Sequence, residues 1–282
     1  METDAAPLAP MLYLVATPIG NMEDITYRAV RVLACVAAVY CEDTRRTGAL
    51  LSKLGIKKPL VSCREQNEAA RAEEIVSRVK AGKPIAYVSD AGMPCVSDPG
   101  ERLVAACVEA DVPFTVIPGA SAMTTALALS GLPSQNACFV GFLPRETKAR
   151  REAIERIAKH RDTLIFYESP LRVASTAKEL SEKLGDRPCA LCRELTKLHE
   201  EVVRGTLSSL AGRYADAPPK GECALVVAGA KEEAGLSVED ARALAQELAS
   251  SGLSAKDAAA ELSARAGLSK NGAYSLIKEM KN

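Results

Sequence analysis

Short apolar runs alternate with stretches of helical periodicity along the first 118 residues. Five runs are typical of buried strands, at 11–17, 37–41, 60–63, 84–88 and 113–117. Between them, apolar residues recur at spacings of three and four, most clearly over 25–36, 67–80 and 101–110. Strands that alternate with helices predict βαβ units and a largely parallel sheet. We therefore expect an N-terminal α/β domain over 11–118.

A second α/β domain is expected over 119–230. The segment Pro118-Gly-Ala-Ser-Ala122 breaks the alternation and opens a helix of small residues, so we place the hinge between the domains here. Strand-like runs follow at 137–142, 163–167, 188–192, 201–205 and 222–228, and helical patterns at 148–159, 170–184 and 207–214. Charged residues in 201–205 favour an antiparallel, partly exposed strand.

Three short helical patterns follow a polar linker at 231–235. They span 238–250, 255–266 and 270–280. A serine that can act as N-cap precedes each pattern, and a glycine stands in each turn: Ser237, Ser254, Ser269, Gly252 and Gly267. Residues 231–282 therefore predict a small helical domain, either a packing bundle or a helix-turn-helix.

Composition restricts the partners and the compartment. The 282 residues include 36 basic and 36 acidic side chains, so any nucleic-acid contact must come from local basic patches. Residues 1–10 are acidic and rich in Ala and Pro, which predicts a disordered tail rather than a signal peptide. No apolar run reaches the roughly 18 residues of a membrane span. We expect a cytoplasmic protein with no membrane contact.

Nine cysteines in such a chain indicate reduced thiols rather than a disulfide framework. Cys189 and Cys192 form a CxxC pair, a spacing that zinc and redox sites use. They lie in a strand-like run, where positions three apart face opposite sides. Core cysteines are therefore the better interpretation, and no metal site is expected.

Three loops rich in Gly, Pro and small polar residues each follow a strand and precede a helix. They are Pro18–Asn21, Ser89–Gly100 and Pro118–Ala122. In the second loop, Asp98, Pro99 and Glu101 have the pattern of an N-cap, an N1 proline and the acid of a capping box. Loops at the carboxyl ends of parallel strands line the ligand cleft of open α/β sheets, and their backbone groups suit a nucleotide-like ligand.

Several common sites are disfavoured by the residues present. The first loop lacks GxGxxG, and the chain contains neither GxxxxGK[ST] nor HExxH. With only two histidines, His160 and His199, there is little material for a His-rich metal centre or a Ser-His triad.

An ordered set of motifs covers residues 11–230. They are Ala16-Thr-Pro-Ile-Gly-Asn-Met-Glu-Asp24, Cys41-Glu-Asp-Thr-Arg45, Ser89-Asp-Ala-Gly-Met-Pro94, Ser97-Asp-Pro-Gly100, Pro118-Gly-Ala-Ser-Ala122, Gly141-Phe-Leu-Pro-Arg145, Phe166-Tyr-Glu-Ser-Pro170 and Cys192-Arg-Glu-Leu-Thr-Lys-Leu-His-Glu200. The set closely resembles the bacterial 16S rRNA (cytidine-2'-O)-methyltransferases of the tetrapyrrole methylase superfamily. The C-terminal helices fit that family's extra small domain.

The resemblance implies two α/β domains with S-adenosylmethionine in the cleft between them, usually in a homodimer that acts on 16S rRNA or the small ribosomal subunit. The cofactor-binding residues implied by motif are Pro18, Asp90, Met93, Ser121, Ala122, Tyr167 and Leu195. Asp90 matches the superfamily's Gly-Asp-Pro loop, where this chain has Ser-Asp-Ala. The Ser-Asp-Ala sequence resembles that of the RNA-modifying branch of the superfamily, and it counts against a porphyrin or corrin substrate.

A ribose 2'-hydroxyl is a poor nucleophile, so a general base should assist methyl transfer. The carboxylates of Glu42 and Asp43, at the end of a strand, are the first candidates, and Glu168 and Glu194 remain open alternatives. An ion-pair cluster at a helix start is an equally good interpretation of Glu42–Arg46.

Basic residues near the predicted cleft are the expected RNA contacts. Arg45 and Arg46 follow the candidate base, and the stretch 145–161 is the most basic in the chain. We expect phosphate contacts from Arg45, Arg46, Arg145, Lys148, Arg150 and Arg151.

Two rival functions make different sequence predictions. A methyltransferase of a tetrapyrrole-like small molecule predicts Gly-Asp-Pro at 89–91 and no C-terminal helices. A ligand-sensing helix-turn-helix regulator predicts a basic recognition helix, yet 270–280 has few side chains that read bases.

Overall fold

The computed structural model describes residues 7–231 and 238–281. By contacts the chain divides into a first unit, Met1–Gly229, and a second unit, Ala230–Asn282. Most of the predicted tail, most of the predicted linker and the cap residue Ser237 lie outside the described residues. Residues 7–10, also predicted as tail, lie against the first unit: Leu8 packs on its core, and the Tyr13 hydroxyl donates to the Ala9 carbonyl at 3.0 Å.

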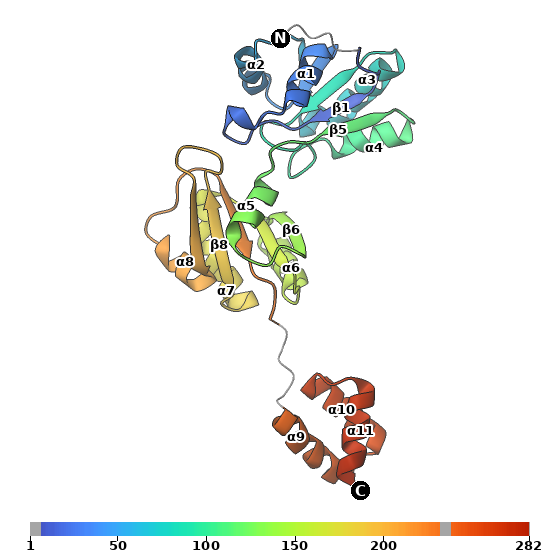
Figure 1. Cartoon of the computed structure of the whole chain (residues 1–282), viewed down its shortest axis with the longest axis vertical. Coiled ribbons are helices and arrows are strands. Elements are labelled where there is room, and N and C mark those ends of the chain that lie inside the picture. Colours follow the sequence, from blue (N-terminus) through green and yellow to red (C-terminus); the bar gives the residue numbers. More distant parts are fainter. Residues whose placement is uncertain (1–6, 232–237, 282) are drawn as a thin grey trace. The chain divides into compact units, whose positions relative to one another are not determined.

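The first sheet of the first unit is parallel throughout, as predicted (Figure 1). Its strand order is β3-β2-β4-β1-β5. The strands are β1 (Leu12–Val15), β2 (Ala38–Cys41), β3 (Leu60–Ser62), β4 (Ile85–Val88) and β5 (Phe114–Ile117). The three strands at the middle, β2, β4 and β1, are fully buried, as in a parallel sheet covered on both faces.

Helices cover both faces of this sheet. They are α1 (Tyr27–Cys35), α2 (Thr44–Lys53), α3 (Glu68–Lys80) and α4 (Glu101–Glu109), with short 3-10 turns η1 (Met22–Asp24) and η2 (Glu65–Asn67). Tyr13 and Val15 of β1 pack with α1 and α2, whereas Leu12 and Leu14 pack with α3 and α4. The alternation of side chains along a strand therefore produces two cores.

Two predicted helix starts were wrong. Helix α1 begins at Tyr27 and not at the predicted residue 25, and it is capped by Thr26, whose hydroxyl accepts from Ala29 N–H. Helix α4 is preceded by Gly100, with φ of 131°, so Asp98 is not its cap. A side chain at Gly100 would collide with the Cys95 sulfur 2.6 Å from the added Cβ position, which requires glycine here.

The second sheet is mixed, with strand order β6-β7-β10-β8-β9. Its strands are β6 (Ala137–Phe142), β7 (Thr163–Glu168), β8 (Pro188–Arg193), β9 (Glu201–Thr206) and β10 (Cys223–Val227). Only the β6–β7 pair is parallel among the strand pairs of the described residues. The predicted antiparallel, partly exposed strand at 201–205 is confirmed by β9.

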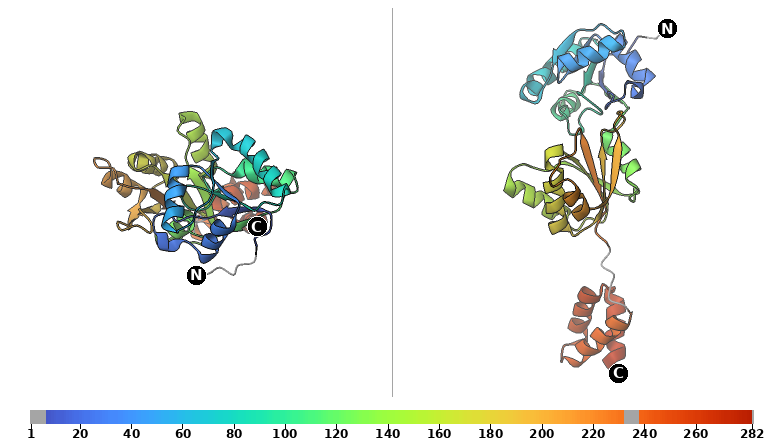
Figure 2. Two further views of the ribbon diagram at one scale, coloured as in Figure 1. Left: turned by 90° about the horizontal axis from the view of Figure 1, so that it is seen from above. Right: turned by 90° about the vertical axis from the view of Figure 1, so that its left-hand side faces the viewer.

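Helices lie on both faces of the second sheet as well. They are α5 (Ala122–Ser130), α6 (Thr147–Ile157), α7 (Val173–Leu184) and α8 (Leu207–Arg213), with η3 (Pro170–Arg172) before α7. Figure 2 shows α5, in green, on the face opposite to the other three. Cys189 packs on the α6–α8 side and Cys192 on the α5 side, which confirms that this CxxC pair faces two ways.

The described part of the second unit contains α9 (Val238–Ser250), α10 (Ala255–Ala266) and α11 (Lys270–Lys281). Ser254 caps α10 by accepting from Asp257 N–H, and the Ser269 hydroxyl accepts from Gly272 N–H, as predicted. Gly252 and Gly267 have positive φ in the turns. Across the described residues, the helices are too short or too polar to cross a bilayer.

Candidate active site

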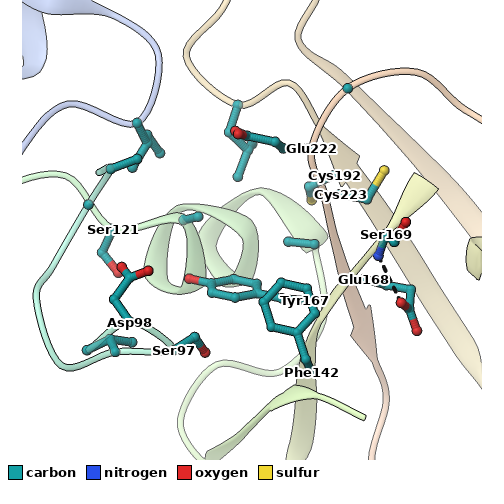
Figure 3. A pocket seen from close by; sticks show the side chains of 18 of the residues that line it. Ser97, Asp98, Ser121, Phe142, Tyr167, Glu168, Ser169, Cys192, Glu222 and Cys223 are labelled. Atoms are coloured by element: carbon teal, nitrogen blue, oxygen red, sulfur yellow. Dashed lines mark hydrogen bonds between the residues drawn. The ribbon is translucent and has the colours of Figure 1, made fainter. Parts of the chain in front are cut away.

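A cavity of about 360 Å³ opens in the first unit, where the loops after the first sheet's strands meet the strand ends of the second sheet (Figure 3). Its wall includes five of the seven cofactor-binding residues expected from the sequence: Met93, Ser121, Ala122, Tyr167 and Leu195. Pro18 and Asp90 are not in the wall. These five residues are up to 102 positions apart in the chain, from Met93 to Leu195.

Backbone hydrogen bonds join the first two predicted loops. Thr17 N–H donates to the Gly92 carbonyl at 2.9 Å, and Gly92 N–H returns a bond to Thr17 at 3.0 Å. Gly92 has φ of 79°, which favours glycine. Pro18 follows this bridge and delivers Ile19 to the cavity wall. These backbone hydrogen bonds therefore hold the two loops together within the protein itself.

Strained backbone borders the cavity. Non-glycine residues with positive φ within the described ranges are Cys95, Ser97, Glu194, Thr196 and Asp111. The first two lie in the 89–100 loop, and the next two flank Leu195. Such conformations cost on the order of 1–3 kcal/mol each and concentrate at functional sites. Their position on two cavity loops marks this region as a candidate site.

An aromatic cluster forms one side of the cavity. The Tyr167 ring lies 5.0 Å from the Phe139 ring and 5.6 Å from the Phe142 ring, edge to face in both cases. Phe142 is exposed and lines the cavity with Tyr167. Burial raises the pKa of the Tyr167 phenol, which therefore stays neutral. These rings provide a flat, apolar surface for a planar ligand.

Asp98, expected from the sequence only as a helix cap, lines the cavity. Figure 3 shows its carboxylate directed into the cavity, toward Ser121 and Tyr167. Burial raises the pKa of Asp98 to about 6, and the negative charges of Glu42 and Asp90 add to the rise, although the Ser89 hydroxyl opposes it. A carboxyl group that titrates near neutrality in a cavity is a candidate acid or base.

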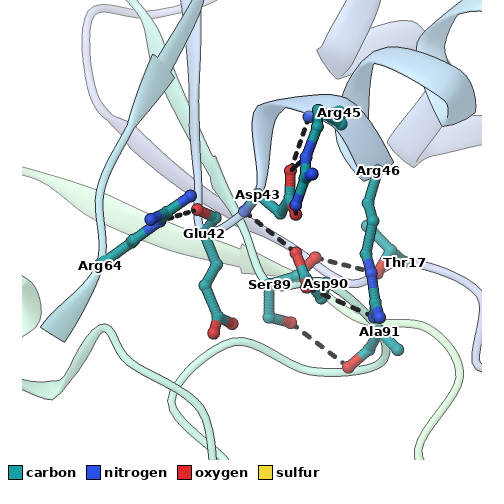
Figure 4. A network of polar contacts seen from close by, with 9 residues as sticks. All are labelled: Thr17, Glu42, Asp43, Arg45, Arg46, Arg64, Ser89, Asp90 and Ala91. Carbon is teal, nitrogen blue, oxygen red and sulfur yellow. Dashed lines mark hydrogen bonds and ion pairs between the residues drawn. The ribbon is translucent and has the colours of Figure 1, made fainter.

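Asp90 fastens its loop to the start of α2 (Figure 4). Its Oδ1 accepts from Asp43 N–H at 3.1 Å, and Arg46 Nη1 lies 3.4 Å from its Oδ2. The side chain therefore connects the end of β4 to the residues after β2.

Asp43 and Glu42 have different environments. Asp43 caps α2 and binds the Arg45 guanidinium through both carboxylate oxygens, at 3.1 and 2.6 Å. These hydrogen bonds hold the pKa of Asp43 far below its usual range, so it is a weak proton acceptor. Burial and the charge of Asp90 raise the pKa of Glu42 instead. Figure 4 shows the Glu42 side chain pointing away from the Asp43–Arg45 pair.

The two alternative bases are occupied by structural bonds. Glu168, 4% exposed, accepts from the Thr176 hydroxyl at 2.6 Å and pairs with Arg172 at 3.4 Å. Glu194 binds Lys197 Nζ at 2.8 Å, and this hydrogen bond lowers the pKa of Glu194. Both carboxylates are therefore engaged with other side chains.

Most of the predicted RNA contacts are on the surface. Arg45, Arg46 and Arg151 have side chains more than half exposed, and Arg145 and Lys148 are exposed as well. Arg150 differs, because its side chain is 11% exposed and donates to Glu179 at 2.6 Å and to the Thr176 hydroxyl at 2.8 Å. The structure therefore makes Arg150 a packing residue of α6.

A family model of the tetrapyrrole (corrin/porphyrin) methylases matches residues 11–211. The chain therefore belongs to the tetrapyrrole methylase family. Curated relatives within it carry a more specific name. A Thermotoga maritima protein called ribosomal RNA small subunit methyltransferase I is 45% identical over 218 residues, which are 77% of this chain and 98% of the relative. The protein of the same name from Synechocystis sp. is 41% identical, and the aligned residues are 96% of this chain and 98% of that relative.

Solved structures support the fold. Uroporphyrin-III C-methyltransferase from Thermus thermophilus superposes with a TM-score of 0.57 at 24% identity, over 78% of this chain and 94% of that one. A cobalt precorrin-4 methyltransferase superposes with a TM-score of 0.58 at 18% identity, over 78% and 95%. The predicted α/β class with tetrapyrrole methylase architecture is thus confirmed.

Proposed function

We propose that this chain transfers a methyl group from S-adenosylmethionine to the ribose 2'-hydroxyl of a cytidine in 16S rRNA of the small ribosomal subunit. The observation that carries the proposal is the 41% identity to a ribosomal RNA small subunit methyltransferase I over 96% of this chain. The cavity supports it, because an enzyme of this kind must enclose a nucleoside cofactor beside an opening for a nucleotide.

The cavity residues fit S-adenosylmethionine. A volume of about 360 Å³ lies within the range of small-molecule sites. Tyr167 and Phe142 offer a flat surface to the purine, and the Asp98 carboxylate suits the positive charge of the cofactor. When bound, the cofactor supplies an electrophilic methyl group. The chain's task is to hold acceptor and donor in line.

Cofactor contact is assigned to the five wall residues already expected from sequence: Met93, Ser121, Ala122, Tyr167 and Leu195. Pro18 and Asp90 are assigned no direct contact with the cofactor, and instead position residues of the wall. Pro18 precedes the wall residue Ile19, and Asp90 fastens the loop that carries Met93. This arrangement also fits functional domains at 11–118, 119–230 and 231–282, with the cofactor at the junction of the first two.

Proton transfer from the 2'-hydroxyl is assigned to Asp98, with Glu42 beside it as a neighbouring charge. A general base works best with a pKa near the operating pH, and the pKa of Asp98 is raised to about 6. Asp43 is less suited because its bonds to Arg45 hold its pKa low. Phosphate contacts are assigned to the exposed residues Arg45, Arg46, Arg145, Lys148 and Arg151.

A homodimer in the cytoplasm completes the proposal. Phe114 and Val116 project from β5, the edge strand of the first sheet, and are 38% and 40% exposed. Large apolar side chains on an exposed edge strand favour coverage by a partner. Light scattering after size exclusion tests the dimer, and a monomer at micromolar concentration would contradict it.

The decisive test offers small subunits from a strain deleted for this gene to the purified protein with methyl-labelled S-adenosylmethionine. Digestion to nucleosides should recover the label in 2'-O-methylcytidine. Label in a base, or transfer to a tetrapyrrole without transfer to rRNA, would overturn the proposal. Subunits from the parent strain serve as the control, because their target is already methylated.

A further inference from the structure

One face of α11 in the second unit combines basic and aromatic side chains. Lys270, Tyr274 and Lys278 are spaced by four residues, which places them on one side of the helix. All three are exposed, and Tyr274 shows 47% of its surface. Ala273 and Ile277 of the same helix are fully buried, so the adjoining side of α11 packs on the unit.

Tyr274 has no role in the core of the second unit. That core consists of Ala, Leu and Ile side chains from the three helices, with Met280 at its margin. Tyr274 is also the only aromatic residue in the sequence after Tyr214. An exposed aromatic ring that does not pack in the hydrophobic core is typical of a contact with a partner.

Charge is segregated between the helices of this unit. Helix α11 carries three lysines and one glutamate, whereas α9 carries three acids and one arginine. Across the described residues, Lys270 and Lys278 form no ion pair, while Arg265 of α10 pairs with Glu261 at 3.7 Å. Lys281 differs, because its Nζ donates to the Leu253 carbonyl at 2.6 Å. The unpaired lysines and Tyr274 are therefore available together.

We propose that the α11 face formed by Lys270, Tyr274 and Lys278 binds a single-stranded segment of the rRNA substrate, with the tyrosine stacked on a base and the lysines on neighbouring phosphates. The proposal rests on the proposed function, from which it takes RNA as the substrate. The lysines lie about 12 Å apart along the helix axis, with the ring midway between them. Aromatic stacking flanked by basic side chains is a common way to bind unpaired RNA without reading its sequence.

A second RNA contact on the same chain raises the effective concentration of substrate at the cavity. The face takes no part in methyl transfer. Loss of the face should therefore raise KM for the ribosomal substrate and leave kcat unchanged.

The first experiment measures binding of the full-length protein to a fluorescent single-stranded fragment of 16S rRNA by anisotropy. The double variant Lys270→Glu/Lys278→Glu should bind about tenfold more weakly at low salt, with the slope of log K against log salt reduced by about 1.4. Tyr274→Ala should lose about tenfold, whereas Tyr274→Phe keeps the ring and should bind like the wild type.

A matched control is available on α10. Lys256 is exposed there, so Lys256→Glu repeats the charge change of Lys278→Glu at another surface. It should leave affinity within twofold of the wild type. Equal losses for the single variants Lys256→Glu and Lys278→Glu, or wild-type binding by the double variant Lys270→Glu/Lys278→Glu, would overturn the proposal. Circular dichroism verifies that the variants are folded.

The second experiment measures methylation of small subunits and of protein-free 16S rRNA with the same variants. A tenfold rise in KM at constant kcat on both substrates is expected. A defect on subunits alone would instead identify a ribosomal protein as the partner and overturn RNA binding. If the wild type methylates no rRNA, the proposed function fails, and the anisotropy data still decide this face by themselves.

Discussion

The Glu68 carboxylate accepts a hydrogen bond from the Gly100 backbone N–H at 2.9 Å and thereby replaces a local cap on α4. The same Oε1 also accepts from Arg102 N–H and Leu103 N–H, at 3.1 and 3.3 Å. Glu68 lies on α3 and is 4% exposed. Because the N-terminal donors of α4 are satisfied from another helix, Asp98 is free to face the cavity.

Replacing Glu68 should destabilise the first unit. Glu68→Ala leaves three backbone donors without their acceptor, and we expect a loss of about 2–3 kcal/mol in the free energy of unfolding. Urea denaturation followed by circular dichroism measures it. Glu73→Ala, at an exposed position of the same helix, is the control and should change stability by less than about 0.5 kcal/mol. Equal effects of the two substitutions would refute the capping role.

Methyl transfer should depend on the ionised form of Asp98. Because the pKa of Asp98 is raised to about 6, kcat should rise with pH through that value and then level off. Asp98→Asn should lower kcat about 100-fold and abolish this limb. Single-turnover rates between about pH 5 and about pH 8.5 provide the measurement. An unchanged limb in the variant would assign the titration to another group.

Stability should respond to Asp98 in the opposite sense. Its folded pKa is raised to about 6 from an ordinary 3.8, so the folded state binds more protons in between, and stability falls as pH rises through that window. Asp98→Asn removes this cost and should stabilise the protein by about 1–2 kcal/mol at pH above about 7, after allowance for solvent screening. The gain should vanish near the lower end of the window. Thermal unfolding of both proteins at the two extremes would reveal it, and a destabilised variant at high pH would count against a buried carboxylate.

Neighbouring arginines on α6 should separate folding from RNA binding. Arg150→Ala breaks the largely buried pair with Glu179 and should cost about 2 kcal/mol of stability. Arg151→Glu, at an exposed position, should leave stability unchanged and weaken RNA binding at low salt. Thermal unfolding and anisotropy on both variants distinguish the two effects. A stable Arg150→Ala protein with weakened RNA binding would restore Arg150 to the RNA contacts.

The aromatic wall should contribute to cofactor affinity. Tyr167→Ala removes the central ring and should raise the Kd for S-adenosylmethionine about tenfold, whereas Tyr167→Phe should change it little. Calorimetric titration supplies both constants. Should the two variants lose affinity equally, the hydroxyl and not the ring would be the contact.

The buried strands and the helix–strand alternation were predictable because burial leaves a periodic record in the sequence. Asp98 was misassigned because Asp-Pro-x-Glu has the pattern of a capping box, while the positive φ of Gly100 and the distant acceptor Glu68 have no local signature. Tertiary contact, not local preference, set the start of this helix.

The burial of Arg150 is predictable from the helical spacing of its neighbours. It precedes Ala153, Ile154 and Ile157 by three, four and seven residues, so it shares their buried face of α6. The mixed second sheet was less accessible, since strand direction depends on which strands become neighbours. β10 inserts between β7 and β8 only in three dimensions.

The reciprocal bonds between Thr17 and Gly92 involve main-chain atoms alone. These two hydrogen bonds do not depend on the side chains at neighbouring positions, provided that residue 92 remains glycine. Loop sequences on either side can therefore diverge during evolution without loosening the frame that they share. The same cofactor-binding framework is therefore compatible with methyl acceptors as different as a macrocycle and a ribose.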